Sequence, residues 1–389
     1  MAPGRTLSTL PYTRLAGFYF FYFAYIGAFG PFFSLYLLAA GRSSFEIGVL
    51  MALPAVARIA APHLWGWLAD AGGSHSLLLR ATTAAGLACF LGVFAGSGFY
   101  WLFAVVLLAS FFLSAALPLI EATTLAHLGE DTGRYGPVRV WGSLGYIVAV
   151  VAIGYALDLI PVDNLPWMIA FTLAGMLVYC WRIPEARLSA HASDTVPIWD
   201  IIKRPQVVAL IAACALMAVA HGPYYTFYSI HVVEHGYTKA LTGWLWALGV
   251  VCEIVIFLYL PRLYSAFTLR AILIGSFALA VARFLVIGWG AQHLVLLLLA
   301  QALHAATFGS FHAAAIGLVH RLFRGRHQAR GQAIYGSLTY GVGGTIGALA
   351  SGYAWDHFGA GLTFTLSAAA ALAGMLLAAW KLPREDDMP

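Results

Sequence analysis

The chain has 389 residues, of which 61% are hydrophobic and only 10% are charged, and its formal net charge is +5. A soluble domain carries about 45–50% apolar and about 25% charged residues. The composition therefore predicts an integral membrane protein whose main solvent is the lipid bilayer. The positive charge does not indicate a nucleic-acid partner, because the basic residues lie mainly in short connections between apolar stretches.

The cysteines do not indicate a metal site. All four lie inside apolar runs, and their spacing matches no known ligand set, so we expect packed free thiols: Cys89, Cys180, Cys214 and Cys252. The sequence predicts neither a metal nor a cofactor.

The apolar stretches predict an all-α fold with twelve transmembrane helices. A helix needs about 20 apolar residues to cross the hydrocarbon core. The first such stretch is longer than the apolar region of a signal peptide, so we expect a membrane span there. The predicted spans lie near residues 15–38, 45–68, 77–96, 101–126, 138–158, 165–182, 206–232, 241–263, 270–290, 294–321, 330–354 and 361–381.

The charged connections predict two halves and an orientation. The longest polar interval predicts a cytoplasmic central loop over residues 183–205, between a six-helix half at 1–182 and another at 206–389. Cytoplasmic connections are enriched in Lys and Arg. When the N-terminus is placed in the cytoplasm, every basic residue outside the spans except Arg42 and Lys239 falls on that side. Both termini are therefore predicted to be cytoplasmic.

Two halves of six spans resemble the layout of the major facilitator superfamily. That resemblance implies a secondary transporter with its substrate site near the midplane between the halves. The connection after the second span, from Gly66-Trp-Leu-Ala-Asp70 to Arg80, is similar to the superfamily's signature loop, although Ser74 and Ser76 stand where basic residues are usual. The resemblance implies that Gly66 lets helices approach closely and that Asp70 and Arg80 belong to a gate. An ordinary polar turn is the alternative.

Charged residues within spans mark a candidate site, because each costs about 2.5–3.5 kcal/mol near the bilayer centre. Glu121 near the inner end of span four and Arg139 at the start of span five lie at similar depth, so they can pair. Tyr146, two turns after Arg139 on the same helix face, offers a ring to an aromatic or sugar substrate. A purely structural tie between Glu121 and Arg139 is the alternative.

A second group lies near the centre of spans eight to ten. Glu253 and Arg283 fall at similar depth and are predicted to pair. Burial favours a protonated acid, whereas a nearby guanidinium favours the carboxylate, a combination that suits a reversible proton carrier. His304 and His312 can relay a proton or bind substrate. Packed neutral histidines and a structural Glu253–Arg283 pair are the alternatives.

The stretch from Pro118-Leu-Ile-Glu121 to Arg139 and Tyr146 is similar to the sugar-binding helices of the lactose permease. In that family a glutamate and an arginine bind the sugar, and an aromatic ring stacks on it. Span ten departs from the pattern, since Gln301-x-x-His304-x-x-Thr307 stands where that permease has lysine, histidine and a proton-carrying glutamate. The departure argues against lactose as the substrate.

Along nearly its whole length the chain resembles the phenylpropionate permease family more closely. The resembling segments are His221-Gly-Pro-Tyr224-Tyr225, Trp246 to Glu253, Arg283, and Leu303 to Phe308 followed by His312. The resemblance implies a proton symporter for an aromatic monocarboxylate. Since the span-ten acid is absent, we assign the proton to Glu253.

We therefore predict a proton-coupled symporter that works by alternating access, as a monomer, in a plasma membrane that the resemblance identifies as a bacterial inner membrane. Its partners are a small-molecule substrate, protons and lipid. A sugar or nucleoside symporter is the alternative, and a non-transporting membrane sensor is the alternative of another class. No nucleophile–base arrangement indicates an enzyme. The predicted substrate residues are Glu121, Arg139, Tyr146, His221, Tyr224, Tyr225, Arg283, His304 and His312, and the predicted proton-coupling residues are Glu253, Arg283 and His304.

The charge distribution makes a testable prediction about topology. A tag fused to either terminus should react with an impermeant reagent only after the membrane is permeabilised, because both termini are predicted to be cytoplasmic. A tag that reacts in intact cells would contradict the predicted orientation.

Overall fold

The computed structural model describes residues 10–71, 74–129, 131–185 and 198–383, without the side chains of Asp70, Thr132 and Arg326. Every regular element in these ranges is helical. Eleven helical stretches are long and apolar enough to cross a membrane, and the last of them, Gln328–Lys381, has 54 residues. Lipid offers no hydrogen-bond partners, so a helix, which satisfies its own backbone groups, is the expected form of each span.

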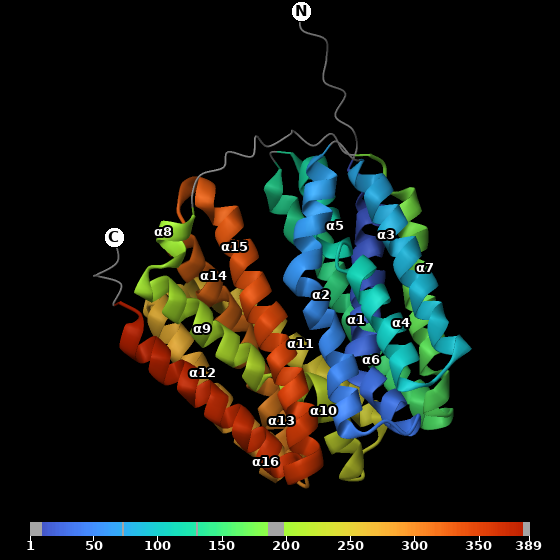
Figure 1. The fold of residues 1–389 in the computed structure, drawn as a ribbon. Helices are drawn as coiled ribbons and strands as arrows, with labels where there is room; N and C mark the ends of the chain where they lie inside the picture. The colour runs from blue at the N-terminus through green and yellow to red at the C-terminus, as the bar shows by residue number, and fades with distance from the viewer. Residues whose placement is uncertain (1–9, 72–73, 130, 186–197, 384–389) are drawn as a thin grey trace, which may run out of the picture.

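The first bundle, coloured blue to green in Figure 1, contains seven α-helices. They are α1 (Tyr12–Ala39), α2 (Ser44–Asp70), α3 (His75–Phe90), α4 (Phe99–Leu113), α5 (Ala116–Leu128), α6 (Tyr135–Leu159) and α7 (Leu165–Arg182).

The second bundle, coloured yellow-green to red, contains nine α-helices and two π-helical segments. They are α8 (Trp199–Ile202), α9 (Pro205–Ala220), α10 (Gly222–Glu234), α11 (Lys239–Ala266), α12 (Leu269–Gly290), α13 (Leu294–Ala302), η4 (Ala305–Ser310), α14 (Phe311–Leu322), α15 (Gln328–Gly336), η6 (Ser337–Gly343) and α16 (Gly344–Lys381).

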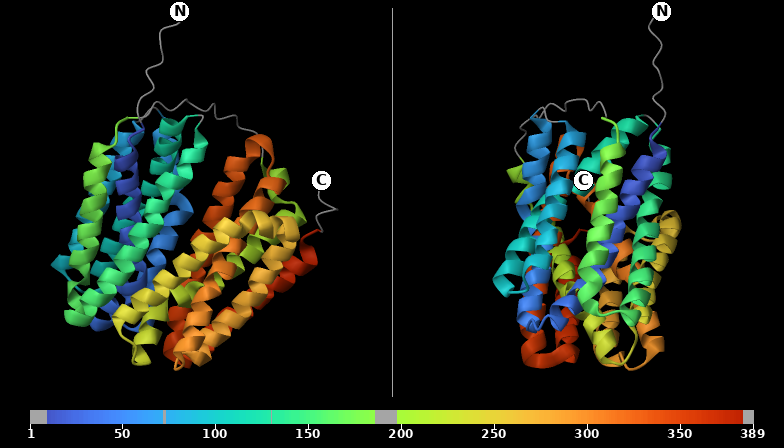
Figure 2. Two further views of the ribbon diagram at one scale, coloured as in Figure 1. Left: turned by 180° about the vertical axis from the view of Figure 1, so that it is seen from behind. Right: turned by 90° about the vertical axis from the view of Figure 1, so that its right-hand side faces the viewer.

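Several spans are interrupted. The α9–α10 stretch breaks at His221, just before Gly222 and Pro223, because proline has no N–H for the helix ladder. The π-helical segments η4 and η6 interrupt two further spans. Within α16 the backbone leaves helical geometry at Gly359, where φ is +75°, and the chain turns back there, so that its red end runs back along the bundle in Figures 1 and 2. The stretch Gln328–Lys381 therefore consists of two helical arms that meet at Gly359, in the region where the sequence predicts two separate spans.

The two bundles meet at the lower end of Figure 1 and diverge toward the end where α8 lies. At the meeting end α2 packs against α16 and α6 packs against α11, and α1 contacts α10. The predicted boundaries of the central loop stay a prediction, since residues 186–197 lie outside the described part.

Glycines permit the closest helix contacts. A Cβ placed on Gly145 of α6 would lie 2.1 Å from the carbonyl oxygen of Phe20 in α1. In the glycine-rich eleventh span, a Cβ on Gly343 or Gly347 would lie 2.7 Å from a backbone oxygen of α9. Small residues in this span therefore let its backbone pack closely against that of α9.

The expectation for Gly66 is wrong in this structure, since a Cβ there would have no neighbour within 4 Å. Gly66 lies near the C-terminal end of α2, where the two bundles diverge (Figure 1). Arg80 donates to the carbonyl oxygen of Ile183 at 2.8 Å and therefore ties α3 to its own half. The Asp70 side chain lies outside the described part, so its gating role stays a prediction.

Gly145→Ala should destabilise the protein, because the added methyl would collide with the backbone of α1. Overpacking of this kind costs about 1–3 kcal/mol. The matched control is Gly136→Ala in the same helix, where a Cβ would meet no atom within 4 Å. The melting temperature in detergent should fall for Gly145→Ala and stay near that of the wild type for Gly136→Ala. Equal values for the two variants would contradict the close α1–α6 contact.

Candidate functional site

A fully buried arginine lies at the centre of the second bundle. Arg283 of α12 donates from Nε to the carbonyl oxygen of Ala300 at 2.9 Å and from Nη1 to Oγ1 of Thr307 at 3.2 Å. Its Nη1 also lies 3.4 Å from Nε2 of His221, at the break between α9 and α10. Groups from two other spans therefore hold the guanidinium, as the cost of burying a charge requires.

Aromatic side chains surround this arginine. Its guanidinium carbon lies 4.2 Å from the centre of the Tyr224 ring, a cation–π distance. Tyr224 donates to Oε1 of Gln301 at 2.9 Å, and its ring lies 4.6 Å from the ring of Trp246. Tyr225 is 41% exposed, and its ring lies 5.8 Å from the ring of His221.

The cluster contains buried polar atoms that have no hydrogen-bond partner among the described residues. They are Nη2 of Arg283, Nε2 of Gln301, Nδ1 of His304 and the hydroxyl of Tyr228. Buried polar groups are nearly always paired, so four such atoms in one cluster indicate a place that a polar molecule completes. The arginine and amide nitrogens can only donate, and the hydroxyl can do so. The cluster therefore suits a ligand rich in acceptor oxygens.

A stack of rings runs from this cluster along span ten. The rings of His304 and Phe308 are 5.3 Å apart and nearly parallel, and those of Phe308 and His312 are 6.2 Å apart. His312 shares a hydrogen bond of 2.8 Å with the hydroxyl of Tyr340 in η6. The stack therefore links both π-helical segments, and such segments are frequent at functional sites.

The first bundle holds a separate polar cluster. Glu121 accepts a hydrogen bond from the hydroxyl of Tyr135 at 3.2 Å. The guanidinium of Arg139 lies 4.0 Å from the centre of the Phe23 ring. Glu121 and Arg139 interact electrostatically but are not among the ion pairs of the described residues. The predicted ion pair is therefore wrong in this conformation, because each group has another partner.

Glu253 is half-buried on α11 and faces span ten, since a Cβ on Gly309 would lie 3.2 Å from its Cγ. The predicted pair with Arg283 is wrong in this conformation, because Ala300, Thr307 and His221 engage that guanidinium. Arg139, from the other bundle, interacts electrostatically with Glu253. Tyr146, also from the first bundle, interacts electrostatically with Glu253 as well.

The structure thus brings most of the predicted residues into three groups. His221, Tyr224, Tyr225, Arg283 and His304 form the cluster in the second bundle, and the ring stack joins His312 to it. Glu121 and Arg139 form the cluster in the first bundle, and Glu253 and Tyr146 lie between the two.

Sequence reasoning gave no binding role to Gln301, Thr307, Tyr228 or Tyr340. Gln301 and Thr307 were noted only as departures from the lactose permease pattern, at positions that are functional there. Their occurrence at those positions is the sequence signal that indicates a binding role for them. Tyr228 and Tyr340 carried no local signal that separates them from packed aromatic residues.

Comparisons with known proteins agree with this architecture. Residues 12–366 match the model of the MFS_1 like family. The chain is 29% identical over 366 residues to a probable 3-phenylpropionic acid transporter of Escherichia coli (strain K12), covering 92% of this chain and 95% of that protein. It is 28% identical over 367 residues to a maltose permease of Geobacillus stearothermophilus, covering 92% of each.

Among solved structures, a mutant of the nucleoside transporter NupG superposes with a TM-score of 0.87 at 16% identity, covering 96% of this chain and 100% of that one. At this identity the likeness shows a shared fold alone.

Arg283→Lys should lower the melting temperature, because an ammonium cannot reproduce the planar arrangement of donors that engages Ala300 and Thr307. The loss of buried hydrogen bonds should cost about 1–3 kcal/mol. Arg262→Lys is the control, since Arg262 is exposed on α11 and lies over the ring of Tyr259. Thermal unfolding in detergent measures both variants. An unchanged midpoint for Arg283→Lys would contradict the role of Arg283 as the organiser of this cluster.

Proposed function

Because the chain belongs to the MFS_1 like family of membrane transporters, we propose that it is a proton-coupled symporter that imports a small aromatic monocarboxylate by alternating access. The observation that carries the proposal is the cluster of unpaired donors around Arg283. A carboxylate has two acceptor oxygens, which the free Nη2 of Arg283 and the amide nitrogen of Gln301 can engage. The apolar part of the substrate would lie against Tyr224, Tyr225 and Trp246.

The proposed substrate class is also supported by a relative. The E. coli protein with which this chain aligns over nearly its whole length is described as a probable 3-phenylpropionic acid transporter. An aromatic ring joined to a carboxylate complements the two features of the cluster: the ring can stack on its aromatic side chains, and the carboxylate oxygens can accept from its hydrogen-bond donors.

A nucleoside or sugar symporter is the second candidate. The ring stack of His304, Phe308 and His312 offers faces to a nucleobase or sugar, and Gln301 and Tyr228 offer polar groups to its hydroxyls. The likeness to the nucleoside transporter fold and to a maltose permease fits this reading. The two candidates differ in the group that Arg283 would contact, which is charged in the first and neutral in the second.

We assign the proton to Glu253. It is half-buried in the membrane interior and is not among the ion-paired residues of the described chain. A carboxyl group in such a place can take up a proton and release it when its surroundings change. His221 is less suited to the task, because Nη1 of the positively charged Arg283 lies 3.4 Å from its Nε2.

We further infer twelve spans, with both termini in the cytoplasm of a bacterial cell and the protein acting as a monomer. The turn at Gly359 lets the stretch Gln328–Lys381 contribute two spans. The bundles diverge at the end where the described chain enters and leaves the central loop (Figures 1 and 2). With that end in the cytoplasm, the conformation is inward-facing.

Uptake into proteoliposomes tests the proposal. With an acidic exterior, wild-type protein should accumulate an aromatic monocarboxylate above its equilibrium level, and an ionophore that collapses the pH gradient should abolish the accumulation. A panel of acids, sugars and nucleosides separates the two substrate candidates. If no compound in the panel enters, the transport proposal fails and a non-transporting sensor becomes the better reading.

Glu253→Gln should abolish accumulation driven by the pH gradient and leave exchange of labelled for unlabelled substrate largely intact, because glutamine mimics the protonated acid permanently. The control is Glu234→Gln, at an exposed helix end outside the site. Accumulation that survives in Glu253→Gln would show that another group couples the proton.

A further inference from the structure

The two bundles are joined at their meeting end by a carboxylate from the second half. Asp356 of α16 accepts a hydrogen bond on Oδ1 from the backbone N–H of Ser44 at 3.2 Å and another on Oδ2 from the N–H of Phe45 at 2.9 Å. Ser44 and Phe45 are the first two residues of α2, in the first half. The positive end of the helix dipole reinforces both bonds.

A carboxylate from the first half makes the reciprocal contact. Asp158 of α6 accepts hydrogen bonds on its two oxygens from the N–H groups of Lys239 and Ala240, each at 2.9 Å. These are the first two residues of α11, in the second half, and the Lys239 ammonium lies 4.0 Å from the same carboxylate. Each half therefore caps one helix of the other.

Glycines lie at equivalent positions in the two contacts between the halves. Gly154 and Gly352 each precede their aspartate by four residues, and Gly48 and Gly243 each follow the first residue of the capped helix by four. A Cβ on Gly154 would lie 2.5 Å from the carbonyl oxygen of Lys239, and a Cβ on Gly352 would lie 2.7 Å from that of Ser44. Because the helix backbones approach closely at these glycines, each carboxylate reaches the N–H groups from which it accepts hydrogen bonds.

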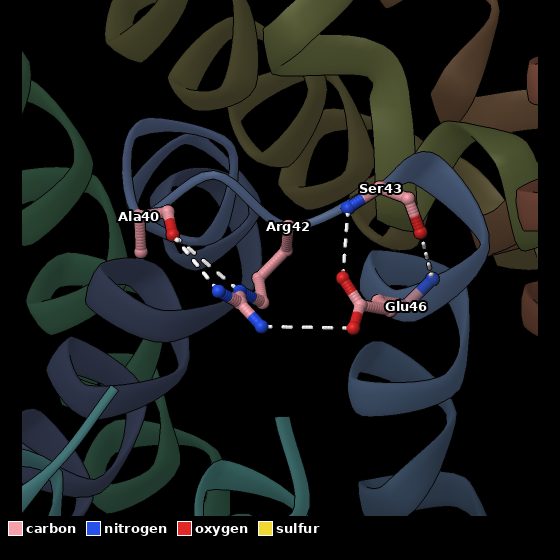
Figure 3. Close-up of polar contacts among 4 residues, drawn as sticks. All are labelled: Ala40, Arg42, Ser43 and Glu46. Carbon is pink, nitrogen blue, oxygen red and sulfur yellow. Dashed lines mark hydrogen bonds and ion pairs between the residues drawn. The ribbon is translucent and has the colours of Figure 1, made fainter. Parts of the chain in front are cut away.

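The capped helices also begin in the same way. Ser43 accepts on its hydroxyl from the N–H of Glu46 at 3.2 Å, and Glu46 accepts in return from the N–H of Ser43 (Figure 3). At α11, the hydroxyl of Thr238 accepts from the N–H of Leu241 at 3.1 Å. In both helices a local hydroxyl satisfies the third amide, while the aspartate of the opposite half satisfies the first two.

We propose that Asp158 and Asp356 are paired gating residues, which hold this end of the transporter closed and must both release before the central site can open there. This role rests on the proposed alternating access. The contacts suit a reversible gate because they join the halves rather than elements within one half. They also lie at the exposed end, where water can replace the carboxylate on the freed amides.

The test measures the distance between the halves at this end with spin labels in lipid nanodiscs. One label is placed at Asp163→Cys between α6 and α7 and the other at Gln292→Cys between α12 and α13, with the four native cysteines replaced by alanine. Unsubstituted protein should give mainly a short distance, with a minor longer one. Each of Asp158→Ala and Asp356→Ala should raise the ratio of the longer to the shorter distance by about tenfold, and the double variant should raise it further.

Asp158→Asn and Asp356→Asn, which keep an acceptor oxygen but lose the charge, should give intermediate populations and serve if the alanine proteins do not fold. Glu234→Ala, at the same end of the second half, should leave the distances unchanged. Unchanged distances in folded double variants would overturn the gating role even where uptake is normal. If the distances shift in a protein that transports no substrate, the gating role is supported. That result would contradict the proposed substrate transport instead.

Discussion

The hydrocarbon core gives a backbone no partner other than itself, and the rest of this structure depends on that constraint. It makes every span a helix, and it makes each break in a helix costly unless nearby groups satisfy the freed atoms. The breaks lie where the functional candidates lie. His221 stands at the α9–α10 break, His304 directly precedes η4, and Tyr340 lies within η6. The irregular backbone and the polar side chains of the candidate site therefore lie together in the interior of the second bundle.

Burial also explains how the second bundle is organised around one charge. Arg283 reaches a carbonyl and a hydroxyl in one neighbouring span and an imidazole in another, so its guanidinium orients those two spans relative to one another. The bundle satisfies two of its three nitrogens and leaves Nη2 without a partner in the described chain. A charge that is mostly but not fully satisfied can both stabilise the fold and bind an anion.

Much of the fold follows from the sequence, because hydropathy measures the property that the bilayer selects. Depth in the membrane also follows, since each residue advances a helix by about 1.5 Å. Depth predicts that Glu253 and Arg283 lie near the centre, but it could not show which way each side chain faces. Rotation about a helix axis depends on tertiary packing, so the predicted pair was wrong. The π-helical segments also depend on tertiary packing, so hydropathy does not predict them.

The two halves are equivalent in their contacts with each other but not in their interior charges. This difference bears on how proton uptake is linked to conformational change. The contacts of Asp158 and Asp356 relate the halves as equivalent repeats, whereas the interior charges do not: Arg139 belongs to the first half, and Glu253 and Arg283 belong to the second. The interaction between Arg139 and Glu253 crosses the interface, so any rocking of the halves changes their separation. An acid that interacts with a positive charge on the opposite half would change its proton affinity as the conformation changes, which is the behaviour that the proposed role of Glu253 requires. Proton uptake can then be linked to the conformational cycle without any contact between the proton and the substrate.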